Sequence, residues 1–171
     1  MSRGHLVRRF WGSLSRREPS APDIEWVEAQ LSRAELELWA RMPVADRRHA
    51  LGVARRLESA LGDDATRPVL AAGLLHDVGK VESGLSTYGR VIATLSVATA
   101  GRATAAAWGE TNGFTRRVGL YAQHESLGAD MLELAGSDPV TVDLLRQHSW
   151  DDADRTVDAH LSAALRAADD A

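Results

Sequence analysis

An apolar run that ends in ionisable side chains constrains the fold of this chain more than any other stretch. Residues 71–75 read Ala-Ala-Gly-Leu-Leu, and residues 76–80 read His-Asp-Val-Gly-Lys. Glycine is the favoured residue just past a helix end, so we expect a buried helix that runs into Gly79. Its last turn would carry His76 and Asp77. An imidazole and a carboxylate buried together cost free energy unless they are paired or bind a metal ion.

Helix start and stop signals recur along the chain from residue 23 onward. Ser32 and Glu35 have the spacing of a capping box, Gly62 follows a helical pattern, and Asp138-Pro139 is a strong helix start. The expected helices cover residues 23–31, 33–42, 45–61, 66–79, 85–100, 115–123, 126–134, 138–148 and 157–170. We find no strand pattern, hairpin signal or internal repeat. The sequence therefore predicts an all-α fold, a compact bundle of about eight or nine helices.

Composition bounds the class of protein. The chain has 171 residues, of which 44% are hydrophobic and 26% charged, as is typical of one soluble globular domain. The absence of cysteine excludes disulfides, thiolate metal sites and cysteine nucleophiles, and it fits a cytoplasmic location. A net charge of −4 argues against stable nucleic-acid binding. No apolar run is long enough for a transmembrane span, and no secretory signal follows the early arginines.

Residues 1–22 form a basic segment that differs from the rest of the chain. Five arginines, at positions 3, 8, 9, 16 and 17, stand against a single acid, Glu18. Apolar residues recur at helical spacing, at positions 6, 7, 10, 11 and 14. Residues 3–17 could make a weak membrane-surface contact, or a terminal helix could pack its apolar stripe on the domain, which we favour. Residues 23–45 are expected to form a helical extension, and residues 46–171 the main domain.

Ionisable residues recur at helix positions in a characteristic order. The set comprises His49, His76, Asp77, His124, His148 and Asp169. Asp169 shares the apolar face of the last predicted helix with Leu161 and Leu165, where a carboxylate is seldom found unless it is paired or metal-bound. Asp170 is the alternative if the register shifts by one. Each residue alone fits a core or surface position, and the order of the whole set is what indicates a site.

This order resembles the HD-domain superfamily of metal-dependent phosphohydrolases. The matching text is Arg48-His49-Ala50-Leu51, residues 74–80, residues 124–129, Arg146-Gln147-His148 and Ala167-Ala168-Asp169. The resemblance implies one or two divalent metal ions. By this likeness the first ion would be bound by His49, His76, Asp77 and Asp169. His124 and His148 would bind a second ion, with Asp77 as the bridge. The Gly-Tyr-Pro segment of the HD-GYP branch is absent, which disfavours cyclic di-GMP as a substrate.

The activity implied by the resemblance is hydrolysis of a phosphate ester or anhydride by metal-activated hydroxide. The expected substrate is a small phosphorylated molecule, with nucleotides as the first class to test. His and Asp ligands favour Fe, Mn, Zn, Co or Ni, and two such ions can clamp a phosphoryl group. Asp77 and Lys80 are the expected catalytic residues, with Lys80 as a point charge on the substrate phosphate. Arg48 is a second candidate phosphate contact, although a solvated surface position fits it equally well.

Two other functions fit the same residues. One is a non-catalytic HD-fold sensor or interaction module that binds metal and nucleotide, and the other is a plain helical bundle with accidental histidines. Filled ligand positions favour the enzyme over a decayed site. Residues 85–113 lie between the His-Asp pair and His124 in the sequence. This stretch could form a substrate lid or a partner-binding surface.

Overall fold

The structure, a computed structural model, describes residues 18–171, and this part of the chain is helical without any strand. It contains the α-helices α2 to α12, nine of which have eight or more residues, and two short 3-10 helices. The predicted all-α fold is confirmed. None of the helices within residues 18–171 is both long and apolar enough to cross a membrane. The amphipathic helix and membrane contact predicted for residues 3–17 lie outside the described residues.

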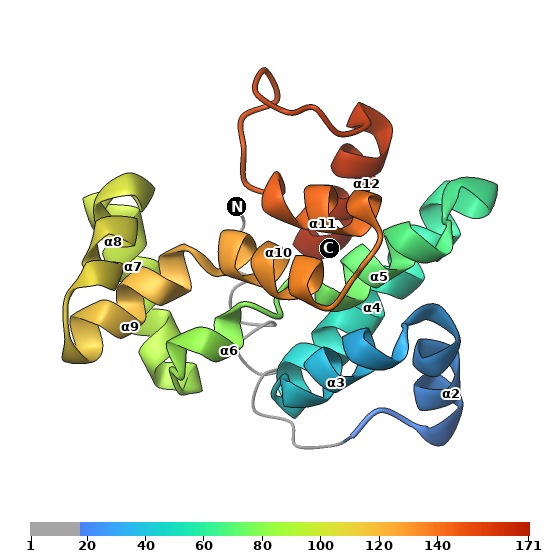
Figure 1. Cartoon of the computed structure of the whole chain (residues 1–171), viewed down its shortest axis with the longest axis horizontal. Coiled ribbons are helices and arrows are strands. Elements are labelled where there is room, and N and C mark those ends of the chain that lie inside the picture. The colour runs from blue at the N-terminus through green and yellow to red at the C-terminus, as the bar shows by residue number, and fades with distance from the viewer. Residues whose placement is uncertain (1–17) are drawn as a thin grey trace.

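The helices follow one another through short connections, as Figure 1 shows from blue to red. Their bounds are α2 Ala21–Gln30, α3 Arg33–Arg41, α4 Val44–Leu61, η1 Gly62–Asp64, α5 Arg67–Leu75, α6 Lys80–Ser83, α7 Thr87–Ala100, α8 Arg102–Ala107, η2 Trp108–Glu110, α9 Gly113–Ala122, α10 His124–Leu134, α11 Pro139–Arg146 and α12 Ala159–Asp170. Each predicted helix has a counterpart. The largest difference is at α5, which ends at Leu75 and not at Gly79.

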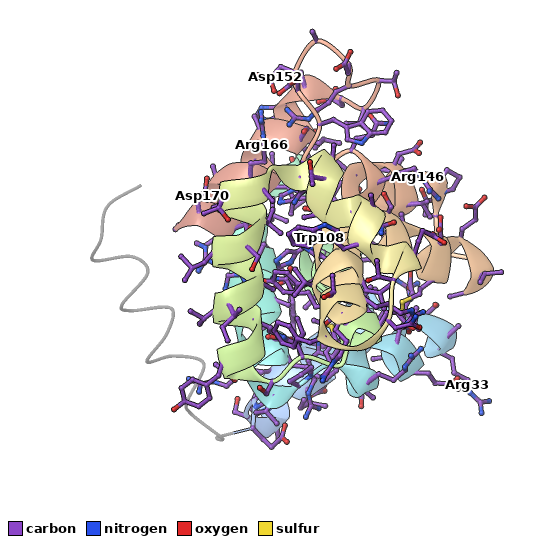
Figure 2. All side chains as sticks on the ribbon, turned by 90° about the vertical axis from the view of Figure 1, so that its left-hand side faces the viewer. Arg33, Trp108, Arg146, Asp152, Arg166 and Asp170 are labelled. Atoms are coloured by element: carbon purple, nitrogen blue, oxygen red, sulfur yellow. The ribbon has the colours of Figure 1, made fainter. Side chains whose placement is uncertain are left out.

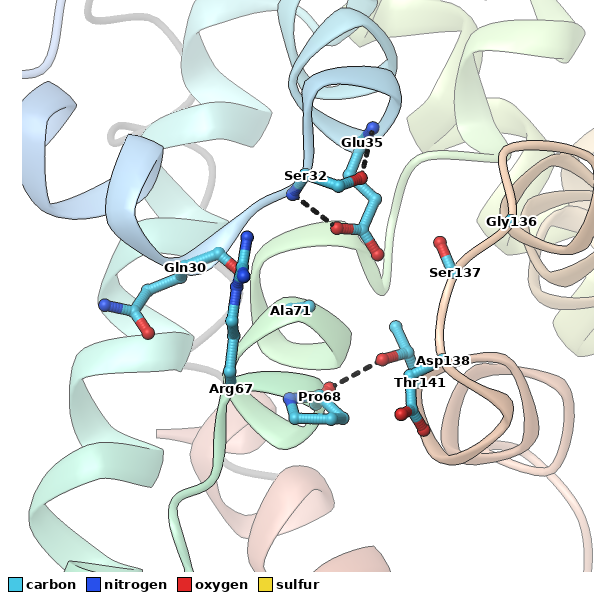
Figure 3. Close-up of a pocket in the computed structure, with 10 residues that line it drawn as sticks. All are labelled: Gln30, Ser32, Glu35, Arg67, Pro68, Ala71, Gly136, Ser137, Asp138 and Thr141. Carbon is cyan, nitrogen blue, oxygen red and sulfur yellow. Dashed lines mark hydrogen bonds between the residues drawn. The ribbon is translucent and has the colours of Figure 1, made fainter.

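Caps fix the helix ends that the sequence indicated. The Ser32 hydroxyl accepts the backbone N–H of Glu35, and the Glu35 carboxylate accepts the backbone N–H of Ser32 at 2.7 Å. This capping box starts α3 and is drawn in Figure 3. Asp138 accepts the N–H of Val140 at the start of α11, and Gly62 ends α4 with a φ of 56°. Local sequence therefore decides where these helices begin and end.

The core is built around α5. Every residue from Val69 to Leu75 is buried, because α4, α11, α2 and α3 pack against this helix. The largest apolar cluster includes Val27, Leu31 and Trp39 from the N-terminal helices together with Leu74 and Leu145. Residues 23–45 therefore share a continuous core with the rest of the chain. A helix with no solvent face is held firmly, so α5 presents a fixed C-terminal end.

Helices α7, α8 and α9 form a second lobe, on the left of Figure 1. The lobe has its own small core of Leu85, Ala93 and Val118, against which Trp108 and Tyr121 pack. Figure 2 looks onto this lobe and labels Trp108 between its helices. The short helix α6 packs against α9 and α10 and thereby joins the lobe to the rest of the molecule.

A cavity of about 210 Å³ lies between the start of α3, the start of α5 and the loop before α11 (Figure 3). Its lining residues are Gln30, Ser32, Glu35, Arg67, Pro68, Ala71, Gly136, Ser137, Asp138 and Thr141. The hydroxyl of Thr141 donates to the carbonyl oxygen of Pro68 at 2.9 Å, which ties α11 to α5. None of the predicted metal ligands lines this cavity, so it is separate from the candidate site.

Candidate metal centre

Five parts of the chain bring the six predicted ligand residues to one place. The residues come from α4 (His49), the turn after α5 (His76 and Asp77), the start of α10 (His124), the turn after α11 (His148) and the last turn of α12 (Asp169). Atoms of His49, His76 and Asp77 lie within 4.8 Å of one another, close enough to hold a metal ion. The cluster joins residues that are up to 120 positions apart in the sequence.

Two carboxylates connect the four histidines. The Nε2 atom of His76 lies 3.5 Å from Oδ1 of Asp77 and 3.5 Å from Oδ1 of Asp169. His124 contacts Asp77 through its Nε2 at 3.7 Å. Asp169 contacts Nε2 of His49 at 2.8 Å through Oδ1 and Nε2 of His148 at 3.6 Å through Oδ2. His76 therefore lies between the two carboxylates, and His124 and His148 contact different ones.

The turn after α5 sets the directions of His76 and Asp77. The helix ends at Leu75 because the backbone changes there to tighter bonds between residues three apart. Val78 donates its N–H to the carbonyl of Leu75 at 2.9 Å, and Lys80 donates to that of Asp77 at 3.0 Å. These bonds keep residues 76–79 compact, and α6 begins directly after them.

Gly79 serves a different purpose from the one its sequence context suggested. Its φ is −65°, which any residue can adopt, so it is not the left-handed residue of a helix end. A Cβ at Gly79 would lie 2.0 Å from the carbonyl oxygen of His124 and 2.6 Å from the backbone nitrogen of Gly128. Glycine is required because the backbones of the turn and of α10 touch. That contact sets His124 beside Asp77.

Hydrogen bonds from Nδ1 orient two of the histidines. Nδ1 of His76 donates to the carbonyl oxygen of Gly73 at 2.9 Å, and Nδ1 of His124 donates to that of Tyr121 at 2.8 Å. A carbonyl oxygen can only accept, so we assign the proton of each ring to Nδ1. The Nε2 atoms are then the lone-pair atoms of the neutral rings, and both face the carboxylates. Metal-binding histidines are commonly oriented in this way.

Both carboxylates of the cluster are held in the charged form. Burial by itself would raise the pKa of Asp77, but Lys80, His76 and His124 lower it far below the usual range. Burial likewise opposes the charge on Asp169, but the neighbouring imidazoles of His148, His49 and His76 outweigh that effect and lower its pKa. The centre therefore presents two negative charges to anything that binds there.

The basic groups of the cluster respond to the same charges in different ways. Burial disfavours a charged His76, yet the carboxylates of Asp77 and Asp169 outweigh it and raise the pKa. Burial dominates at His124, whose pKa is lowered. Lys80 is buried as well, but its ion pair with Asp77 raises its pKa. A neutral His124 and an ionised Asp77 are the protonation states that a metal ion requires of these ligands.

The buried donor atoms fit a bound metal ion. Nε2 of His76 is buried and forms no hydrogen bond within the described part of the chain, although it lies between two carboxylates. A buried polar atom without such a partner is costly, and coordination to a cation would compensate for it. Imidazole nitrogens and carboxylate oxygens together suit divalent transition metals. The cluster can therefore hold a metal ion.

The remaining predicted site residues differ in position. Nζ of Lys80 lies 2.6 Å from Oδ2 of Asp77, so this lysine belongs to the cluster. Arg48 is exposed on α4 and forms no hydrogen bond or ion pair with any of residues 18–171. Asp170 lies at the edge of α12 away from these contacts, and the register of the helix points Asp169 and not Asp170 at the histidines.

Two aromatic and acidic neighbours of the cluster were missed from the sequence. The ring of Tyr121 stacks on His124 with centroids 5.6 Å apart and has the Lys80 ammonium 5.9 Å from its centre. Glu125 is buried beside His124 and accepts two hydrogen bonds from Arg102 of α8, at 2.9 and 3.0 Å. The second lobe thus contributes side chains around the centre. A stacked tyrosine leaves no local sequence pattern that could have revealed it.

Comparison with known proteins gives no relative of this chain. No family model, no curated protein and no solved structure matches it. Arguments about its function therefore rest on its own residues and geometry.

Proposed function

We propose that this chain is an HD-type metal-dependent phosphohydrolase that acts on a phosphate ester or anhydride, with nucleotides as the first substrate class to test. One observation carries the proposal. The residues that match the HD pattern, from His49 to Asp169, converge in one cluster of nitrogen and oxygen donors, with His76 and Asp77 buried at its centre. A helical bundle with accidental histidines would not be expected to gather all of them around two ionised carboxylates.

The proposed ligands divide into two groups. His49, His76, Asp77 and Asp169 would hold one divalent ion, and His124 and His148 would contribute to a second. Bound divalent ions would lower the pKa of a water molecule and neutralise the phosphoryl oxygens of the substrate. Fe, Mn, Zn, Co and Ni suit this donor set. The contact of His124 with Asp77 supports Asp77 as the ligand shared between the two groups, and His148 contacts Asp169 of the first group.

Lys80 has two proposed tasks. Its ammonium group pairs with Oδ2 of Asp77 at 2.6 Å and so keeps this carboxylate ionised and oriented. An ammonium carries three N–H donors, so the same group can also donate to a substrate phosphate. Lys80 is the only lysine in the sequence. Tyr121, against Lys80 and His124, would form the wall beside the bound phosphate.

The proposal is tested by metal content and turnover measured together. Elemental analysis of tag-free wild type should give one or two transition-metal ions per chain, and Asp77→Ala and Asp169→Ala should lose them. The matched control is Asp170→Ala, because Asp170 is the exposed neighbour of Asp169. The metal-loaded wild type should then hydrolyse members of a panel of aryl phosphates, nucleotides and dinucleoside polyphosphates, and Asp77→Ala should not.

The outcomes separate the alternatives. If the protein binds metal and binds nucleotides tightly but hydrolyses none of them, its function is that of the sensor or interaction module and not of the enzyme. No metal after reconstitution with Mn or Fe would contradict both. Turnover that persists in Asp77→Ala would show that the activity does not arise at this centre.

A further inference from the structure

A buried carboxylate borders the cavity drawn in Figure 3. Glu35 lines this cavity and is only 6% exposed. Its Oε2 atom accepts the backbone N–H of Ser32, whereas Oε1 accepts no hydrogen bond from residues 18–171 and faces the cavity (Figure 3). Glutamate is almost never buried unless its charge is paired, and Glu35 forms no ion pair within this part of the chain. The cavity therefore offers a carboxylate acceptor to a ligand.

A cationic group borders the same cavity. Arg67 lines it from the start of α5, and its Nε donates to the backbone carbonyl oxygen of Gln30 at 2.9 Å. Its two Nη atoms form no hydrogen bond or ion pair with residues 18–171, so they are available to a ligand. The first turn of α5 adds N–H groups, because Thr66 makes no side-chain cap there. This end of the cavity suits a carboxylate.

Charge and size limit the class of ligand. Two acidic side chains, Glu35 and Asp138, and one basic side chain, Arg67, line the cavity, so a simple anion is disfavoured. The volume of about 210 Å³ is below the range of about 300–1,000 Å³ that is typical of sites for drug-sized ligands. A small molecule that carries both an ammonium group and a carboxylate matches this lining. The hydroxyl of Ser137, which is buried at the wall and forms no hydrogen bond with the described residues, adds a further polar group.

The cavity is distant from the metal centre along two helices. Helices α5 and α11 both begin beside the cavity and end beside the centre, where His76 and His148 follow them. The bond from Thr141 to Pro68 joins the starts of the two helices at the cavity wall. A ligand in the cavity is therefore separate from any ligand of the metal centre.

We propose that this cavity binds a free α-amino acid, whose ammonium group donates to Oε1 of Glu35 and whose carboxylate accepts from the guanidinium of Arg67. Glu35 and Arg67 line one small cavity but form no ion pair with each other. A zwitterion would give each of them a partner of opposite charge. The proposal does not depend on the proposed phosphohydrolase activity.

Proton–nitrogen correlation NMR of the full chain tests this binding. L-alanine should shift the backbone amide signals of Ser32, Ala71 and Thr141 around the cavity and leave that of His124, at the metal centre, unchanged. Ethylamine is alanine without its carboxylate, and propionate is alanine without its ammonium group. Each should bind at least about tenfold more weakly than L-alanine, as expected for the loss of a charge-assisted hydrogen bond.

Glu35→Gln separates the charge of this residue from its role in the fold. Glutamine completes a capping box as glutamate does, so the start of α3 is kept. The dissociation constant for L-alanine should rise at least about tenfold, and Arg67→Gln should have an effect of similar size. Glu37→Gln is the matched control, because its side chain is 71% exposed on the same helix, and it should bind L-alanine as the wild type does.

Three results would overturn the proposal. One is the absence of shifts at the cavity amides at millimolar L-alanine. Another is binding of ethylamine as tight as that of L-alanine, which would assign the cavity to a simple cation. The third is unchanged affinity in both Glu35→Gln and Arg67→Gln, which would place the amino acid elsewhere on the protein. Circular dichroism of each variant confirms that the compared proteins are folded.

Discussion

Arg56 on α4 donates a hydrogen bond from Nε to the carbonyl oxygen of Ala168 at 2.7 Å. The last carbonyls of a helix lack partners within the helix, and Arg56 provides one for the residue directly before Asp169. Gly52 provides the room, because a Cβ there would lie 3.2 Å from Nη1 of Arg56. This contact fixes the last turn of α12 in the register that faces Asp169 toward His49 and His76.

Arg56→Ala should therefore weaken the metal centre without removing a ligand. We expect the free energy of unfolding to fall by about 1.5–3 kcal/mol, the range for a hydrogen bond from a charged group. Metal affinity should fall with it, because the last turn of α12 frays more easily. Chemical denaturation and metal titration measure the two effects. Arg33→Ala, whose side chain is 95% exposed, is the control. Full metal affinity in Arg56→Ala would show that Asp169 is held in place by other contacts.

Gly79→Ala should disrupt the centre through the backbone. The added methyl group would overlap the carbonyl oxygen of His124, and neither backbone can move without separating Asp77 from His124. We expect a loss of more than about 3 kcal/mol of stability, or a folded protein that has lost its metal. Gly89→Ala on α7 is the control, because the nearest neighbours of its methyl group would be side-chain atoms of Leu85 and Ser86, away from the centre. Normal stability and metal content in Gly79→Ala would contradict the backbone contact.

Local signals in the sequence predicted the helices well, because caps act over three or four residues. Ser32 with Glu35 and Asp138 with Pro139 mark helix starts that the structure contains. Other parts of the site depend on contacts between distant residues. The contact of Gly79 with α10 and the bond from Arg56 to Ala168 each join positions that no local pattern relates. The order of residues in the sequence identified the six predicted ligands as one set. The structure adds Tyr121, Glu125 and Arg56 around them.

The pKa of Asp169 predicts how stability depends on pH in the metal-free protein. Its pKa is lowered in the folded state, so its contribution is present above its ordinary value of 3.8 and is lost as the pH falls below it. Asp169→Asn should therefore destabilise the chelator-treated protein at pH 7, and this destabilisation should begin to decrease as the pH falls below 3.8. Urea unfolding at each pH measures the difference. Asp170→Asn, at an exposed position, should show no such trend. An effect of Asp169→Asn that stayed constant with pH would show that the charge of Asp169 is not what stabilises the fold.

The last prediction concerns how His124 and His148 share the metal ions. If both bind the second ion, His124→Ala and His148→Ala should each lose one ion of two, and the double variant should lose no more. The affinity for that ion should fall by at least about 10–100-fold, because losing even a residue that only hydrogen-bonds to a metal ligand has an effect of this size. The alternative is that each histidine binds a different ion, since His124 contacts Asp77 and His148 contacts Asp169. In that case the double variant should lose both ions. His160→Ala, exposed on α12, should retain the wild-type metal content. Elemental analysis after dialysis distinguishes these outcomes, and wild-type content in both single variants would exclude either histidine as a ligand.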